Sequence, residues 1–498
     1  MVSASRRRTT GAALPRAAAA LALLLAAPRL DAQDITPSAR DDLSLPAVRR
    51  VGDTLLLSDG RRIAPLPRLL SVREQFDLRV QWLARRHELL LPMMRRHGVG
   101  MWIVVNEEFH DDPLTAHVAP PLVYVSRRDV HVFVDGGDAG LQRYSNYWRP
   151  TATYARFFQP LPAPRSDRGT SDLAVGLREL VARAKPRSVA LAIGGPRGQD
   201  GGLSKDSYDL IVAAIGPEYA RRIIPAAPLI EEYLDTRLPE ELEHYRTLVE
   251  ATDLLTQRAL SNEVITPGRT TAADVAWWFN DQIARLGVGA TPWFEIHTAV
   301  QRFDPATGRM IPYVHPAPED YVYQAGDVIH IDVGFNYLGL ASDWQKVAYV
   351  LRPGETSVPA GLEVALHNGN RTQEALRTAP RPGMSGHEAT IATLEALRGV
   401  NFTPSIYSHP IGTHGHGVGP QINARGGVVP ARPELDSKLR LGSYRSIELS
   451  ATTRIPEWND GELIIPFEDD AVLTADGYVW FRPPQTRWYL IRSSVPVP

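Results

Sequence analysis

Four acidic residues lie in pairs along two segments whose patterns predict β-hairpins. Asp332 follows the β-branched run 328–331, and Asp343 lies on the returning segment, after a turn predicted at 336–339. Pairing that is symmetric about this turn would place Asp332 directly opposite Asp343, with their Cβ atoms about 4.5–5.5 Å apart. Two like charges in this position destabilise a strand pair unless a counter-charge lies near them.

The second hairpin repeats the arrangement. Glu448 lies on a predicted strand at 446–455, and Glu468 ends the returning strand 461–468 after a loop at 456–460. Symmetric pairing places these two glutamates opposite each other. One such pair alone is equally consistent with a solvent-exposed strand face, but two pairs in apolar strands favour a bound cation. Carboxylates that bridge two metal ions about 3.5–4 Å apart are the usual basis of a dinuclear hydrolytic site.

A nitrogen ligand is expected from the glycine-rich segment 408–417, which contains His409, His414 and His416. Spacing alone does not select among them, because a histidine in a loop is more often a surface residue than a ligand. Four carboxylates, one imidazole and no thiolate form an oxygen-rich set that favours manganese, cobalt or iron over a structural zinc site. The sequence has no cysteine, which excludes disulfides and thiolate catalysis. His-Glu-x-x-His, P-loop and Gly-x-Ser-x-Gly motifs are absent.

The elements that must position these residues follow from hydrophobic periodicity. Alternating helices and strands predict an α/β domain over residues 69–232. Its predicted elements are helices at 71–97, 171–184 and 203–215 and strands at 101–105, 130–134 and 188–193. A boundary is expected near 235–239. Helices are predicted from about 240 to 260 and at 272–286, and the chain to 490 mixes strands with one helix near 386–397.

The N-terminus has the pattern of a secretory signal at residues 1–33, with a basic region before the apolar run Ala17–Ala27. The run has 11 residues, too few to span a bilayer, and the alternative is an ordinary N-terminal helix. Residues 34–68 are expected to form an extended lead-in. Loss of residues 1–33, with five arginines and one aspartate, changes the formal charge from −2 to −6. We therefore expect an exported protein (periplasmic or secreted) with no membrane span in its mature form and no affinity for nucleic acid.

At this point the chain resembles the aminopeptidase P/prolidase family of "pita-bread" metallopeptidases, over about residues 69–490. In that family an Asp, a second Asp eleven residues later, a His and two Glu bind two metal ions. The matching residues here are Asp332, Asp343, His409, Glu448 and Glu468. The resemblance implies a creatinase-like N-terminal domain (69–232) and an α+β pita-bread catalytic domain (240–490).

The resemblance also implies roles. Glu448 would act as general base for the attacking water, and His315 and His416 would hold the scissile carbonyl. The metal pair would be manganese first, with cobalt, iron or zinc as alternatives. The substrate would be a peptide with proline second, cleaved after its first residue, and the protein would form dimers or tetramers. His414 receives no role.

Three positions depart from the family pattern. Pro466 stands where an Arg is common, Ser405 where a His is common, and Leu449 where a Pro is common. The metal ligands are unaffected, so the departures bear on specificity and rate. Two other functions therefore stay open: hydrolysis of another amide or C–N bond, and a non-catalytic binding module. The sequence does not decide between dipeptide and oligopeptide substrates.

Overall fold

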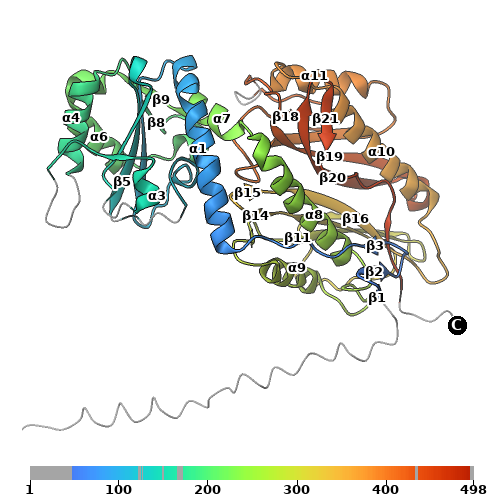
Figure 1. Ribbon diagram of the computed structural model, residues 1–498. Helices are drawn as coiled ribbons and strands as arrows, with labels where there is room; N and C mark the ends of the chain where they lie inside the picture. Colours follow the sequence, from blue (N-terminus) through green and yellow to red (C-terminus); the bar gives the residue numbers. More distant parts are fainter. Residues whose placement is uncertain are drawn as a thin grey trace, which may run out of the picture. The chain divides into compact units, whose positions relative to one another are not determined.

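The computed structural model describes residues 48–121, 125, 127–147, 151–164, 172–431 and 436–493 (Figure 1). The predicted signal segment 1–33 and the first part of the predicted lead-in lie outside these residues. Within the described ranges, no helix combines the length and apolar character needed to cross a bilayer.

The described part of the lead-in is a small antiparallel sheet, not the extended segment that we predicted. Its strands are β1 (Val48–Val51), β2 (Thr54–Leu57) and β3 (Arg62–Ile63). Leu57 and Ile63 are buried against Leu254. The buried Arg61 donates hydrogen bonds to the carbonyl oxygens of Gln257 (2.8 Å) and Leu260 (2.6 Å). The lead-in is therefore attached to the helix that contains Leu254 and Gln257 and to Leu260, which caps its C-terminal end.

The predicted α/β region contains a six-stranded sheet in the order β7-β6-β5-β4-β8-β9. Its strands are β4 (Met101–Glu107), β5 (Arg128–Asp135), β6 (Leu141–Ser145), β7 (Gln159–Pro160), β8 (Val189–Leu191) and β9 (Ile223–Pro225). Its helices are α1 (Val72–Arg96), α2 (Thr115–Val118), α3 (Ala152–Ala155), α4 (Leu173–Ala184), α5 (Gly198–Gly201), α6 (Lys205–Ala220) and α7 (Ala227–Asp235). The predicted helices and strands of this region are all present.

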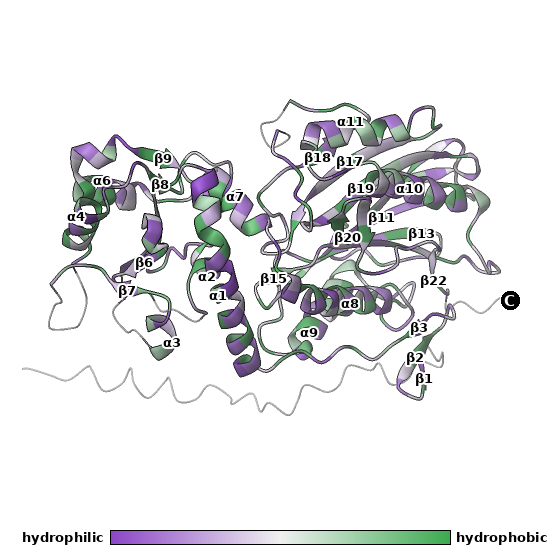
Figure 2. Cartoon of the chain, turned by 45° about the horizontal axis from the view of Figure 1, so that its top comes forward, coloured by the Kyte–Doolittle hydropathy of each residue, from purple (hydrophilic) through white to green (hydrophobic). Residues whose placement is uncertain are grey.

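Residues on opposite faces of β4 enter two different cores, as the two-residue period of a strand requires. Trp102 and Val104 pack with residues of α1 and α7, whereas Ile103 packs with residues of α4 and α6. Helix α1 begins with a capping box formed by Ser71 and Glu74. It carries both hydrophilic and hydrophobic residues along its length (Figure 2), as expected of a helix with one face in a core.

The C-terminal region is built on a ten-stranded sheet among the described residues. Its main order is β12-β11-β13-β16-β20-β19-β17-β18, with β21 paired to β20 and β22 paired to β16. Its strands are β11 (His297–Asp304), β12 (Arg309–Val314), β13 (Asp327–Val333), β16 (Trp344–Val350), β17 (Thr403–Ile411), β18 (Ile422–Ala424), β19 (Tyr444–Ile455), β20 (Gly461–Thr474), β21 (Gly477–Trp480) and β22 (Tyr489–Ile491).

Helices cover both faces of this sheet. The predicted helices α8 (Leu242–Ala259) and α9 (Ala272–Leu286) share one core with β13 residues such as Ile329. Helices α10 (Ala360–Thr378) and α11 (Gly386–Ala396) contribute to the second core, which includes Val328 of β13. Helix α11 agrees with the prediction at 386–397.

Helix α10 is absent from our prediction, because the Asn-Gly-Asn sequence at 368–370 is typical of a loop. Gly369 lies inside the helix and faces β20. A Cβ atom there would lie 2.8 Å from the Phe467 ring and 3.0 Å from Ile465. The glycine therefore allows the helix to approach the sheet closely, a tertiary requirement that local sequence does not show.

The first predicted hairpin exists, but its predicted register is wrong. The chain reverses in a two-residue turn at Leu338 and Gly339, with φ values of 61° and 74°, and not in a four-residue turn. The short strands β14 (Phe335–Tyr337) and β15 (Leu340–Ala341) extend the hairpin, and β14 also pairs with β10 (Thr291–Pro292).

As a result, Asp332 pairs with Gln345 instead of Asp343. A two-residue shift keeps a side chain on the same face of the strand pair, so Asp343 still lies near Asp332. The second hairpin has the predicted register: β19 and β20 place Glu448 directly opposite Glu468.

Candidate metal centre

The five predicted metal ligands converge, and neighbouring strands supply them. Asp332 lies on β13, Asp343 immediately precedes β16, and the other three lie on β17, β19 and β20. Two trios of side chains each bring one ligand atom within 4.8 Å of the others: Asp332, Asp343 and Glu468, and His409, Glu448 and Glu468. Glu468 belongs to both trios, which is the arrangement expected for two adjacent cations that share a carboxylate.

His409 is oriented as a ligand. Its Nδ1 lies 3.1 Å from the carbonyl oxygen of Pro410, which fixes the ring. Its Nε2 is buried and makes no hydrogen bond. Nε2 lies 3.4 Å from Glu448 Oε2, 3.6 Å from Glu468 Oε1 and 3.8 Å from Asp343 Oδ2. A ring with one nitrogen bound to a carbonyl and the other free among carboxylates is typical of a metal-ligating histidine. The residues therefore fit a divalent cation.

Burial and mutual repulsion make the ionised cluster costly without a cation. Burial, and then the charge of Glu468, raise the pKa values of Asp332 and Asp343 well above the ordinary range. The same two causes raise the pKa of Glu448 to about 7. Burial opposes protonation of His409, but Glu448 and Glu468 outweigh it and raise its pKa to about 9. One shared histidine cannot neutralise four carboxylates, so bound cations would stabilise the ionised state.

Polar side chains around the cluster hold the ligands in place. Gln345 Nε2 donates to Glu448 Oε1 (3.0 Å) and to Glu468 Oε2 (2.8 Å). The hydroxyl of Ser446 also donates to Glu468. Asp470 accepts hydrogen bonds from the backbone N–H of Asp343 (3.3 Å) and the hydroxyl of Tyr245 (2.9 Å). We did not predict Gln345, because our incorrect register placed an aspartate opposite Asp332.

His416 lies beside the metal ligands. Its ring centroid is 4.6 Å from that of His409, and it forms a third trio with Asp343 and His409. Burial, and then the neighbouring His409, lower the pKa of His416 to about 4, so its ring is neutral at neutral pH. His414 accepts a hydrogen bond from the backbone N–H of His416 at 3.1 Å, and its side chain is exposed.

A contact from the α/β region supports the loop that carries His416. Arg197, which precedes α5, donates through Nη1 to the carbonyl oxygen of His416 at 2.6 Å. Trp293 packs against His416 with ring centroids 5.0 Å apart. Neither Arg197 nor Trp293 was predicted, because contacts between such distant segments leave no local pattern.

A pocket of about 350 Å³ opens beside the metal ligands. It is lined by His315, Asp332 and Glu448, and also by Tyr313 and Tyr407. Burial, and then His297, lower the pKa of His315. The structure thus places His315 beside Asp332, and His416 beside Asp343 and His409.

The three departures from the family pattern all lie in the wall of this pocket, at Ser405, Leu449 and Pro466. Arg425, which follows β18, lines it as well. Ser405 accepts a hydrogen bond from the backbone N–H of Gly426 at 3.1 Å. The serine therefore holds the loop that carries the arginine.

The C-terminal region is similar to known metallopeptidases. Residues 243–475 match the family model described as Metallopeptidase family M24. No curated protein matches the sequence. This match confirms the resemblance found in the sequence, and it supports a metallopeptidase of family M24 in the C-terminal region.

Solved structures with a similar fold include an X-Pro aminopeptidase, an Xaa-Pro dipeptidase and an aminopeptidase P. The X-Pro aminopeptidase of Thermotoga maritima is 18% identical, with a TM-score of 0.57, and the alignment covers 80% of this chain and 99% of that one. The Xaa-Pro dipeptidase of Bacillus anthracis is 17% identical, with a TM-score of 0.56 and coverage of 82% and 99%. A variant of Escherichia coli aminopeptidase P is 16% identical, with a TM-score of 0.52 and coverage of 83% and 95%. Their folds agree with the predicted pita-bread architecture.

Proposed function

We propose that the protein is a dinuclear metallopeptidase that removes the first residue from peptides with proline in second position. The observation that carries this proposal is the pair of ligand trios that share Glu468, next to an open pocket. Two of the similar structures are named as an X-Pro aminopeptidase and an Xaa-Pro dipeptidase, and the third is named aminopeptidase P. These names support the proposed Xaa-Pro specificity.

The residues fit two divalent cations, with Glu468 shared. Asp332 and Asp343 would hold one, and His409 and Glu448 would hold the other, with Asp343 also close enough to bridge. Manganese, cobalt or iron suit this oxygen-rich set. Such cations supply a water whose pKa is lowered towards neutrality.

Glu448 is the residue placed to move the proton. It lines the pocket, whereas Glu468 is buried and fixed by Ser446. Its carboxyl accepts a hydrogen bond from Gln345 on Oε1, while Oε2 faces His409. Glu448 would take the proton from the attacking water and pass it to the leaving amine.

His315 and His416 would hold the scissile carbonyl. The pKa values of both are lowered by burial, so both rings are neutral at neutral pH. A neutral imidazole still has one N–H to donate, and donors aimed at a carbonyl oxygen stabilise the negative charge that develops there.

The test uses the purified chain with bound manganese and a panel of peptides. We expect release of the first residue from Xaa-Pro dipeptides, from longer Xaa-Pro peptides, or from both, and at least tenfold slower release from matched Xaa-Ala peptides. Elemental analysis should find about two metal ions per chain. A protein that binds the metals but cleaves no Xaa-Pro peptide would favour another amide substrate. A protein that binds no metal would favour a binding module.

We also propose that the protein is exported, on the sequence of residues 1–33 alone. N-terminal sequencing of the mature protein tests this, since a start near residue 34 is expected.

A further inference from the structure

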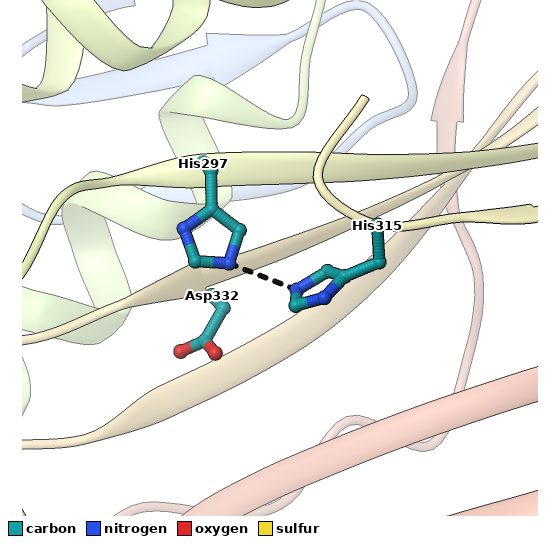
Figure 3. Close-up of side chains that lie close together, drawn as sticks. All are labelled: His297, His315 and Asp332. Atoms are coloured by element: carbon teal, nitrogen blue, oxygen red, sulfur yellow. Dashed lines mark hydrogen bonds between the residues drawn. The ribbon is translucent and has the colours of Figure 1, made fainter. Parts of the chain in front are cut away.

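Three side chains meet at the edge of the candidate metal centre, in a cluster that the sequence did not indicate (Figure 3). His297 lies on β11 directly opposite Asp332 on β13. His315 follows β12, and its Nε2 lies 2.8 Å from Nε2 of His297. His297, His315 and Asp332 each bring a ligand atom within 4.8 Å of the other two.

The hydrogen bond at the other side of the His297 ring fixes which nitrogen carries the proton. His297 Nδ1 lies 2.8 Å from the carbonyl oxygen of Glu295, so Nδ1 is the donor. In the neutral ring, Nε2 then has a lone pair, and this lone pair points at Nε2 of His315 (Figure 3). A metal-ligating histidine usually has this arrangement, with its second nitrogen donating to a carbonyl.

The spacing of the two imidazoles suits a shared cation. Two histidine nitrogens bound at about 2.0–2.1 Å in adjacent positions around one ion lie roughly 2.9 Å apart in octahedral geometry and roughly 3.4 Å apart in tetrahedral geometry. The observed 2.8 Å is a hydrogen bond between the two rings, so an ion could take its place with a small increase in their separation. The ring of Tyr313 stacks on His315, with centroids 5.7 Å apart and an interplanar angle of 11°, which holds the ring in this orientation. His315 is exposed in the pocket, so an ion can reach it from solvent.

We propose that His297, His315 and Asp332 form an additional site for a divalent cation, next to the two ions of the proposed centre. Two imidazoles and one carboxylate favour cobalt, nickel, copper or zinc over manganese or magnesium. The site shares Asp332 with the proposed pair and His315 with the proposed substrate site, whereas His297 has no role in the proposed function.

Occupation of this site has a consequence that rests on the proposed function. A cation on His315 Nε2 removes that nitrogen from the substrate carbonyl. Cobalt in excess of the first ions therefore inhibits peptide cleavage, in competition with the substrate. The inhibition depends on His297, while cleavage at low cobalt concentration does not require it.

The test is equilibrium dialysis of the full chain against Co²⁺, followed by elemental analysis. We expect His297→Asn to bind one equivalent less than the unchanged protein. His387→Asn, which alters an exposed histidine on α11, should bind the same number as the unchanged protein. By contrast, His409→Ala removes a ligand of the proposed pair and leaves the three ligands of the additional site in place. Equal counts for the unchanged protein and His297→Asn, with thermal unfolding showing both folded, overturn the additional site.

Two further measurements separate this inference from the proposed function. If His297→Asn loses an equivalent but the unchanged protein cleaves no peptide, the additional site stands and the proposed function falls. For an active protein, the inhibitory Co²⁺ concentration should rise at least tenfold in His297→Asn and in His297→Gln. Cobalt inhibition that is unchanged in both variants contradicts the site even if one of them is unstable.

Discussion

Glu448 differs from Asp343 and Glu468 in its exposure to the pocket, which those two ligands do not line. Its side chain is 21% exposed, whereas those of Asp343 and Glu468 are 4% and 1% exposed. A proton carrier must reach the substrate, and a ligand that only holds an ion need not. This difference supports the assignment of proton transfer to Glu448 and of metal sharing to Glu468.

Glu448→Gln tests that assignment. The amide keeps the shape of the side chain but cannot accept the water proton. We expect kcat to fall about 10²- to 10⁴-fold, the usual contribution of a general base. Thermal unfolding should stay close to that of the unchanged protein. The matched control is Glu462→Gln, an exposed change on β20 that should leave kcat unaffected. A Glu448→Gln protein with full activity would remove the proton-transfer role.

Arg425 offers a positive charge in a pocket that has lost the arginine common at position 466. We expect Arg425→Ala to raise KM roughly tenfold or more for peptides with a free C-terminal carboxylate, because a hydrogen bond to a charged group contributes about 1.5–3 kcal/mol. Amide-capped peptides should show little change. The control is Arg454→Ala, which alters an exposed arginine on β19. Equal effects on both peptide types would mean that Arg425 does not bind the carboxylate.

At the scale of elements, the two hairpins show what sequence reasoning could predict. The pairing of Glu448 with Glu468 followed from symmetry about one loop and is correct. The same reasoning failed for Asp332, because Leu338 adopts a left-handed conformation that is unusual for leucine and the turn is two residues shorter than predicted. The ligands were still identified, since a shift of two residues preserves the face of the strand.

Contacts between distant strands could not be predicted in this way. His297 and Gln345 reach the site only because β11, β13 and β16 are neighbours in the sheet. A histidine or glutamine on a strand carries no signal of its own, since its partners are fixed by register and sheet order. Helix α10 was missed for the same kind of reason, because its central glycine is required by packing against Phe467.

That packing leads to a prediction about stability. Gly369→Ala improves helix propensity by about 1 kcal/mol, but the new methyl group would lie within 3.0 Å of Phe467 and Ile465. Overpacking of this kind costs about 1–3 kcal/mol, so we expect a net loss in the free energy of unfolding. Urea denaturation measures it. Val364→Ala, at an exposed position of the same helix, should change stability by less than about 0.5 kcal/mol. A stabilised Gly369→Ala protein would show that the helix can shift.

At the scale of the whole molecule, the charge of the metal centre affects folding. The pKa values of Asp332, Asp343 and Glu448 are raised in the metal-free folded chain, mainly by burial. A carboxyl with a raised pKa stabilises the fold at low pH and loses this contribution as the pH rises through its folded pKa. His409, with a pKa raised to about 9, stabilises the fold below its unfolded pKa and loses this contribution towards pH 9.

We therefore expect these four groups of the metal-free centre to contribute less to stability as the pH rises from about 4.5 to 9. Glu468 acts in the opposite direction, because its contacts, first of all with His409, outweigh its burial and lower its pKa. It is a single group, whereas four groups of the centre (Asp332, Asp343, Glu448 and His409) have raised pKa values. Bound cations favour the ionised carboxylates, so the Tm of the metal-loaded protein minus that of the metal-free protein should increase with pH. Calorimetry with and without a chelator measures this difference. A difference that does not change with pH would contradict the proposed ligand set.

The ionic and polar contacts that join the α/β region to the catalytic region include three made by arginines. Arg440 pairs with Glu231 (2.7 Å) and Asp235 (3.0 Å) of α7, and Arg86 of α1 pairs with Glu241. The third contact is different, because Arg197 binds the backbone of the loop that presents His416. The first two contacts hold the two regions together. The third lets a residue of the α/β region support His416, which we place at the substrate.

Arg197→Ala separates positioning from metal binding. Without the hydrogen bond to its carbonyl oxygen, His416 would be less well fixed near the substrate, and a positioning error of this kind lowers kcat more than metal affinity. We expect kcat to fall about tenfold with an unchanged metal content, and Arg197→Lys to restore part of it, because lysine can still donate to the carbonyl. Arg183→Ala, at an exposed position of α4, is the matched control. If Arg197→Ala lost metal and activity together, the α/β region would be needed for assembly of the centre and not for the position of His416.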